Sequence, residues 1–140
     1  MSKKKTTIIL SMLLAFAASA YAQQQEKTPT PDEMAEKEAE RLERLFKLED
    51  WQVFYVDSTL RTNYAGMMEE ITGLQKSRVN NLELFYDVRD KWTEKTQNSY
   101  KKYFTPEQWN AYLKQEGNGI IKEREKRRAK QQKQEAKKKK

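Results

Sequence analysis

YFTPEQWNAYL, the stretch from Tyr103 to Leu113, contains the clearest helix start in the chain. The Thr105 hydroxyl can accept a hydrogen bond from the backbone N–H of Gln108, and the Gln108 side chain can return one to the backbone of Thr105. Pro106 fits the first helical position, where its missing N–H costs nothing. The stretch therefore predicts a helix that begins at Pro106.

A shorter copy of this pattern lies upstream in LEDWQ, the stretch from Leu48 to Gln52. In both copies an apolar residue, Leu48 or Phe104, is followed four positions later by a glutamine. The repeat predicts two related helix starts in one chain. It carries no chemistry by itself.

The first 22 residues have the three parts of a secretory signal peptide. Three lysines precede an apolar run from Ile8 to Ala18, and Ala20-Tyr21-Ala22 offers small residues at a cleavage site. The run is shorter than the roughly 20 residues that a membrane-spanning helix needs. We expect cleavage after Ala22 and a periplasmic mature chain, the alternative being an uncleaved membrane anchor.

The composition argues against several classes of function. The chain has no Cys and no His, so no disulfide can staple the fold and the two preferred ligands of zinc are missing. Neither a Ser-His nor a Cys-His pair can form. Neighbouring acids such as Glu69-Glu70, or Asp87 with Asp90, are interpreted as a solvated helix face. We expect no enzymatic activity, no metal and no cofactor.

The positive charge is concentrated at the C-terminus. The net charge is +7, but residues 23–121 hold 14 basic and 18 acidic residues, whereas residues 122–140 hold 11 basic and three acidic ones. Lys122 to Lys140 is a basic tail with helix-forming residues and nothing to bury, hence a frayed helix or disordered. Three interpretations stay open: it binds an anionic membrane or lipopolysaccharide surface, it attracts acidic clients, or it keeps the protein soluble. Export argues against nucleic acid as a partner.

Apolar residues recur at helical spacing in four segments of the mature chain, and no segment alternates with the period of a strand. After a flexible leader at residues 23–30, Thr30 and Glu33 offer a second capping box. We expect helices over residues 31–48, 50–78, 81–103 and from 106 to an interruption at Gly117-Asn118-Gly119.

The predicted fold is all-α, with one helical domain over residues 31–121 followed by the basic tail. The second helix, of roughly 28 residues at about 1.5 Å each, would reach some 40 Å. We therefore expect an elongated, hairpin-type arrangement of four helices. Gly66 and Gly73 lie on nearly one face of this helix, where they can allow a close crossing or a bend; Gly73 can also end the helix.

The two glutamine-containing copies, on an exported, all-helical and Cys-free chain, resemble the paired LTxxQ signatures of the Spy/CpxP family of periplasmic proteins. Leu48-Glu49-Asp50-Trp51-Gln52 keeps the leucine and the glutamine but has glutamate in place of threonine. Phe104-Thr105-Pro106-Glu107-Gln108 departs only by phenylalanine for leucine. In the order and spacing of its elements, the resemblance covers about Glu33 to Arg128.

This resemblance implies a cradle-shaped, curved four-helix dimer whose concave face holds unfolded or partly folded proteins without ATP. It also implies that the motif residues are architectural. In this chain they are Leu48, Gln52, Phe104, Thr105 and Gln108. Because Glu49 replaces the threonine of the first copy, Asp50 is a candidate to cap the second helix in its place.

Independently of the resemblance, the chain has more aromatic side chains than thin helices can bury, so some should be exposed. The candidate client-binding residues are Phe54, Tyr55, Tyr86, Trp92 and Tyr100. The alternative is that these rings fill the core or a dimer interface. We expect Trp51 and Trp109 in the core because they follow helix starts.

The leading hypothesis is a periplasmic, ATP-independent, chaperone-like protein of the envelope stress response. As a homodimer it would bind unfolded or partly folded envelope proteins. One alternative is a non-chaperone regulator or sensor that docks one envelope partner. Another is an adaptor that binds anionic surfaces through the basic tail.

Overall fold

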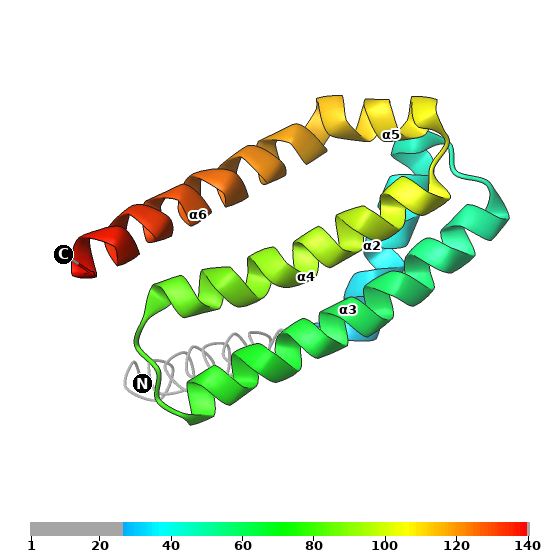
Figure 1. Ribbon diagram of the computed structural model, residues 1–140. Coiled ribbons are helices and arrows are strands. Elements are labelled where there is room, and N and C mark those ends of the chain that lie inside the picture. The colour runs from blue at the N-terminus through cyan, green and yellow to red at the C-terminus, as the bar shows by residue number, and fades with distance from the viewer. Residues whose placement is uncertain (1–26, 140) are drawn as a thin grey trace, which may run out of the picture.

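The computed structural model describes residues 27–139, which form helices and no strand (Figure 1). The all-α prediction is confirmed for these residues. In chain order the elements are α2 (Pro31–Phe46), α3 (Asp50–Lys76), α4 (Leu82–Tyr103), α5 (Pro106–Tyr112), η1 (Leu113–Gly117) and α6 (Asn118–Lys138). The expected signal peptide and the first part of the expected leader lie outside the described residues.

Both threonine-led helix starts are confirmed. The Thr30 hydroxyl accepts a hydrogen bond from the Glu33 backbone N–H at 3.2 Å, and the Glu33 carboxylate accepts one from the Thr30 N–H at 2.8 Å. Thr105 and Gln108 exchange the corresponding bonds at 3.2 and 2.9 Å. α2 and α5 therefore begin where local side-chain chemistry satisfies the free N–H groups of the first turn.

α3 begins without a threonine. Its N-cap residue is Glu49, and Asp50 is already the first helical residue. The Gln52 amide oxygen accepts a hydrogen bond from the Glu49 backbone N–H at 2.9 Å. The expectation that Asp50 caps this helix is wrong, because Gln52 reaches back to the residue three positions before it.

The helices form two hairpins whose turns lie at the same end of the molecule (Figure 1). α2 and α3 make the first hairpin, and α4 with the rod α5–η1–α6 makes the second. α3 packs against both α2 and α4, and α5 reaches back to α2. α6 then runs back along α4, to which its arginines bind.

The hydrophobic core lies at the end where the two turns meet. The rings of Phe46, Tyr100, Phe104 and Tyr112 form a cluster there, with neighbouring centroids 5.2 to 6.2 Å apart. The buried apolar residues are Ala35, Ala39, Leu42, Phe46, Leu48, Val56, Leu60, Tyr100, Phe104 and Tyr112. Because every element except η1 and α6 supplies part of this core, the two hairpins form one folding unit.

The two tryptophans expected in the core are placed differently. Trp51 is 50% exposed, because at 100° per residue it lies on the opposite side of α3 from the buried Leu60. Its indole N–H donates to the Glu49 carboxylate at 2.7 Å. Trp109 is partly buried against the core, stacked on Tyr112 with centroids 5.3 Å apart. The core prediction is therefore wrong for Trp51 and holds in part for Trp109.

The glycines act differently from one another. A Cβ on Gly66 would collide with the ring of Trp92, so Gly66 allows the close approach of α3 and α4 that the sequence suggested. Nothing lies within 4 Å of a Cβ on Gly73, and α3 continues past it to Lys76. Gly73 therefore does not end the helix.

The expected interruption at Gly117-Asn118-Gly119 does not occur. The chain passes from α5 through one π-helical turn, η1, directly into α6, and Gly117 has helical angles of φ −60° and ψ −44°. A Cβ on Gly117 would lie 2.6 Å from the ring of Tyr112. The missing side chain thus lets the Tyr112 ring pack against the helix backbone, and contacts elsewhere in the fold outweigh the low helix propensity of glycine.

The basic tail is helical up to Lys138. The expectation that it has nothing to bury is wrong, because Arg124 is only 5% exposed. Among the helices of residues 27–139, none is both long and apolar enough to cross a membrane.

Candidate functional site

The two motif glutamines bond each other and both turns. Gln52 Nε2 donates to the Tyr103 carbonyl at 2.8 Å and to Gln108 Oε1 at 2.6 Å. Gln108 Nε2 donates to the Lys47 carbonyl and to Gln52 Oε1, both at 3.2 Å. Each amide therefore caps its own helix and also holds the turn of the other hairpin.

The other motif residues also lie at this junction. Leu48 and Phe104 are each 6% exposed and belong to the core, and Thr105 caps α5. Their contacts stabilise helix starts and turns. We call Gln52 and Gln108 the glutamine pair.

The expected client-binding aromatic residues do not form one surface. Phe54 and Tyr55, on α3, are 67% and 48% exposed. Tyr86, on α4, is half-buried, with the guanidinium carbon of Arg127 5.4 Å from its ring centroid. Trp92 is half-buried against Gly66.

Tyr100 departs most from that expectation. It is only 4% exposed, and its ring stacks on Phe104 with centroids 5.2 Å apart. It belongs to the core because it lies on the face of α4 that meets the turn end of both hairpins. Tyr100 is therefore not part of an exposed aromatic surface.

α3 carries a second apolar face that the core does not cover. Exposed residues recur there at steps of three or four, starting from Trp51. They are Trp51, Phe54, Tyr55, Ser58, Thr62, Ala65 and Met68. No residue of this face is charged from Trp51 to Ala65, although 35% of all residues are Asp, Glu, Lys or Arg, and the exposed Glu69, four residues after Ala65, marks its charged end. We call this set the outer stripe.

A layer of buried polar side chains separates the core from the far ends of the helices. Asn63 on α3 donates to the Thr96 hydroxyl at 2.9 Å. Gln97 donates to the Tyr112 hydroxyl at 3.0 Å and accepts from Arg124 at 2.9 Å. These bonds satisfy polar groups that would otherwise be costly to bury.

Residues 96–99 of α4 are all polar, yet the first two of them are buried. Thr96 and Gln97 are 8% and 3% exposed. Their partners lie 15 to 33 residues away in the chain. No local pattern could have identified these partners. A polar segment on a helix that also carries aromatic core residues was nevertheless a signal that some of its polar side chains are buried.

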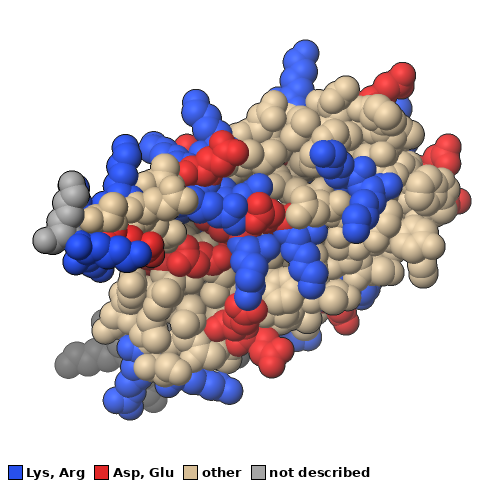
Figure 2. Space-filling model, viewed as in Figure 1, with Lys and Arg blue, Asp and Glu red and all other residues tan. Residues whose placement is uncertain are grey.

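An ion-pair ladder joins the acidic face of α4 to α6. Arg127 binds Asp90 through two bonds of 2.7 Å, and Arg128 binds Glu94 at 2.6 and 3.2 Å. The hydrogen bond from Arg128 lowers the pKa of the Glu94 carboxyl. Figure 2 shows basic and acidic side chains interleaved over this part of the molecule.

The ladder corrects the interpretation of Asp90. Its side chain is 10% exposed and paired, so it does not belong to a solvated face. The neighbouring Asp87 is exposed and accepts a bond of 2.7 Å from Gln131. The tail's three arginines thus bind α4 side chains.

The lysines of α6 lie on a different side of that helix. Five lysines spaced three or four residues apart lie within about 80° of arc around the helix axis, on the side opposite Arg124, Arg127 and Arg128. This set is Lys122, Lys126, Lys130, Lys133 and Lys137, all of them exposed. We call it the lysine face.

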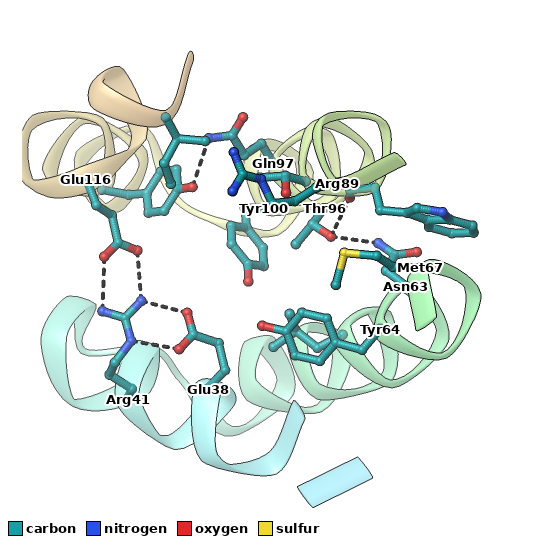
Figure 3. A pocket seen from close by; sticks show the side chains of 15 residues that line it. Glu38, Arg41, Asn63, Tyr64, Met67, Arg89, Thr96, Gln97, Tyr100 and Glu116 are labelled. Atoms are coloured by element: carbon teal, nitrogen blue, oxygen red, sulfur yellow. Dashed lines mark hydrogen bonds and ion pairs between the residues drawn. The ribbon is translucent and has the colours of Figure 1, made fainter. Parts of the chain in front are cut away.

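A cavity of about 320 Å³ lies between α2, α3, α4 and η1. On one side of it, Arg41 binds the Glu38 carboxylate at 2.6 and 2.7 Å and the Glu116 carboxylate at 2.9 and 3.0 Å (Figure 3). These hydrogen bonds raise the pKa of Arg41. Burial raises the pKa of the nearby Tyr64 phenol to about 12, with a contribution from the negative charge of Glu38.

Within residues 27–139, no group of three acidic side chains is placed to hold a metal ion. Comparison of the chain with models of protein families, with curated proteins and with solved structures found no match.

Proposed function

We propose that the protein is a periplasmic, ATP-independent, chaperone-like protein of the Spy/CpxP type that holds unfolded or partly folded envelope proteins. The observation that carries this proposal is the outer stripe, an exposed face without a charged residue from Trp51 to Ala65 on a chain otherwise rich in charge. The motif resemblance and the expected signal peptide are consistent with it. Mass spectrometry of the exported protein should find an N-terminus at Gln23.

The outer stripe has the chemistry of a weak, sequence-tolerant binding surface. The rings of Trp51, Phe54 and Tyr55 form edge-on neighbours 5.6 to 6.3 Å apart, and such rings can contact any apolar side chain. Beyond them, the Ser58 hydroxyl can bond an unfolded backbone, and the Thr62 hydroxyl, which donates to the Ser58 carbonyl at 3.1 Å, can accept a bond from a backbone N–H. From Trp51 to Met68 the stripe covers some 25 Å at about 1.5 Å per residue, long enough for a segment of extended chain.

The test is aggregation of a denatured, unrelated client protein at near-stoichiometric amounts of the mature protein. We expect suppression by the wild type and weaker suppression by Phe54→Ser. Leu82→Ser is the matched control, because Leu82 is 62% exposed, close to the 67% of Phe54, but lies outside the stripe. Equal suppression by both variants, or none by the wild type, would contradict the proposal.

The outer stripe could instead dock one partner, as expected for a regulator or sensor. Cross-linking in envelope extracts separates the two functions, because a chaperone captures many proteins and a regulator captures one. A single dominant partner, together with no effect on aggregation, would favour the regulator.

A homodimer could also cover the outer stripe. Analytical ultracentrifugation of wild type and Phe54→Ser tests this directly. If the wild type is a dimer and the variant a monomer, the stripe is the dimer interface and does not bind clients. A dimer that survives the substitution leaves the stripe free for them.

The lysine face supports a second candidate function, binding to anionic membrane or lipopolysaccharide surfaces. The ladder arginines are already paired with α4, whereas the lysines lie on the opposite side of α6. Vesicles of anionic phospholipid should bind the wild type and should bind K126Q/K130Q/K133Q more weakly, by about 1 kcal/mol per lysine removed. K101Q/K102Q/K114Q makes the same charge change at exposed positions outside α6 and should bind like wild type. Equal losses in both triple variants would indicate attraction by net charge alone.

A further inference from the structure

The cavity between α2, α3, α4 and η1 is a feature of the described chain that the proposed function leaves unused. Its volume of about 320 Å³ lies at the small end of the range for ligand sites, about 300–1,000 Å³. It is walled by aromatic and apolar side chains, with charged groups on one side. These walls are Leu60, Tyr64, Met67, Trp92, Tyr100, Tyr112 and Ile120.

The Tyr100 hydroxyl points into this cavity without a partner. Tyr100 is 4% exposed, and its hydroxyl makes no hydrogen bond to any residue from 27 to 139. Figure 3 shows it directed at the open centre, which the Tyr64 hydroxyl also faces. Because this hydroxyl keeps open surface inside the cavity and bonds no described side chain, it is free to donate to or accept from a polar atom of a ligand.

The charges beside the cavity favour a cation. Two carboxylates, Glu38 and Glu116, share the single guanidinium of Arg41, which leaves one negative charge in excess. Each carboxylate oxygen has a second lone pair that Arg41 does not use. Arg89 also lines the cavity, but its guanidinium stacks on the ring of Tyr86 at 4.8 Å and pairs with neither Glu38 nor Glu116 among the described contacts.

The aromatic walls favour the same kind of ligand. The faces of tyrosine and tryptophan rings attract cations, and the phenolic oxygens of Tyr64 and Tyr100 can accept hydrogen bonds from an ammonium group. Leu60, Met67 and Ile120 offer apolar contact to a short hydrocarbon body. An anion would meet the excess carboxylate and would be disfavoured.

We propose that this cavity binds a primary ammonium group carried on a short apolar body. The ammonium group lies among the Tyr64 and Tyr100 hydroxyls and the Glu38–Arg41–Glu116 cluster, and the body lies against Leu60 and Met67. The ligand is a small free amine or the lysine side chain of a bound polypeptide, since both carry the same group. This site is separate from the outer stripe and does not depend on it.

Isothermal titration calorimetry with three probes of one shape tests the charge preference. 2-Phenylethylammonium should bind at least about tenfold more tightly than 2-phenylethanol, a difference of one charge and one donor group, and 3-phenylpropionate should not bind. N-acetyl-lysine methylamide presents the lysine side chain; binding of this probe but not the free amine identifies a polypeptide as the source. Failure of both cations to bind at millimolar concentration, or equal binding of the alcohol or the anion, would overturn the proposal.

The tryptophan indole N–H signals in the NMR spectrum locate the binding. Of the three tryptophans, only Trp92 lines the cavity. Titration with 2-phenylethylammonium should shift the Trp92 signal most and leave that of Trp51 in place. A larger shift at Trp51 would place the amine on the outer stripe and overturn the proposal.

Tyr100→Phe provides the sharpest variant, because it removes a hydroxyl that bonds nothing in the protein and so should leave the fold intact. We expect binding of 2-phenylethylammonium to weaken by about three- to tenfold, the effect of one hydrogen bond. Tyr55→Phe makes the same change outside the cavity and should bind like wild type. Glu116→Gln should reduce the preference for the ammonium probe over the alcohol. Unchanged affinity in Tyr100→Phe, with an unchanged thermal unfolding midpoint, would refute the site.

Discussion

The side-chain amides of Gln52 and Gln108 bond each other in both directions, with Nε2···Oε1 distances of 2.6 and 3.2 Å. Each also accepts from the backbone N–H at its own helix start and donates to a carbonyl in the other hairpin's turn. All four amide N–H groups of the glutamine pair are therefore used. The pair links two helix starts that lie 56 residues apart in the chain.

Substitution of either glutamine by alanine should destabilise the fold. Gln52→Ala leaves the Tyr103 carbonyl and one amide of Gln108 unpaired in a partly buried site, and each unsatisfied group costs about 1–3 kcal/mol. Because both glutamines share partners, the double variant should lose less than the summed single losses, with a coupling energy of about 0.5–3 kcal/mol. Urea unfolding of the wild type, the two single variants and the double variant measures this coupling energy. Gln75→Ala, an exposed helical glutamine, is the control; strict additivity would show that the pair does not act as a unit.

Gly66→Ala and Gly73→Ala should have opposite effects on stability. A methyl group at Gly66 meets the Trp92 ring, and overpacking of this kind costs typically about 1–3 kcal/mol. At Gly73 nothing lies within 4 Å, so alanine should stabilise α3 by roughly 0.5–1 kcal/mol through helix propensity. The thermal unfolding midpoints of both variants, each compared with wild type, test these two expectations. Stabilisation by both would mean that Trp92 does not lie against Gly66 in solution.

Asp90→Asn should release α6 from α4. The substitution removes the charge that Arg127 binds through two 2.7 Å bonds, and hydrogen bonds to charged groups contribute about 1.5–3 kcal/mol. Hydrogen–deuterium exchange should become faster in residues 118–138 and remain unchanged in α2. Asp87→Asn changes an exposed acid on the same helix and should alter exchange little. Unchanged protection of α6 in Asp90→Asn would show that the ladder does not hold it.

Stability should fall at alkaline pH because of buried tyrosines. Burial raises the pKa of Tyr64 to about 12 and that of Tyr100 well above its ordinary value of 10. Below pH 10 both the folded and the unfolded phenols are neutral, so the contribution is fully present. As pH rises from 10 towards 12, the unfolded phenol of Tyr64 ionises first and stability is lost.

The measurement is the urea midpoint of wild type and Tyr64→Phe as a function of pH. The variant should lose less stability between about pH 9 and pH 12 than the wild type, because it has one fewer phenol that ionises only on unfolding. Parallel curves would show that Tyr64 is solvated in the native state. Lysine deprotonation affects both proteins alike and therefore cancels in the comparison.

Helix positions could be predicted from the sequence, whereas the faces they bury could be predicted only in part. The boundaries at Thr30 and Thr105 were correct because a capping box involves residues three apart, whose geometry the local chain determines. The apolar period of α3 was also correct. The exposure of Trp51 was missed because position in a first turn does not say which side of the helix meets its neighbour.

The sequence by itself determined an all-α chain, the starts of its helices and a pair of related turns, since capping and periodicity act over a few residues. Only the tertiary structure decided that Asn63, Thr96, Gln97 and Arg124 are buried, that the helix continues through Gly117, and that Tyr100 faces a cavity. The physical reason is that each of these outcomes depends on a partner from another part of the chain. A polar side chain is stable in the interior only when such a partner forms hydrogen bonds with it, and the local sequence does not identify that partner.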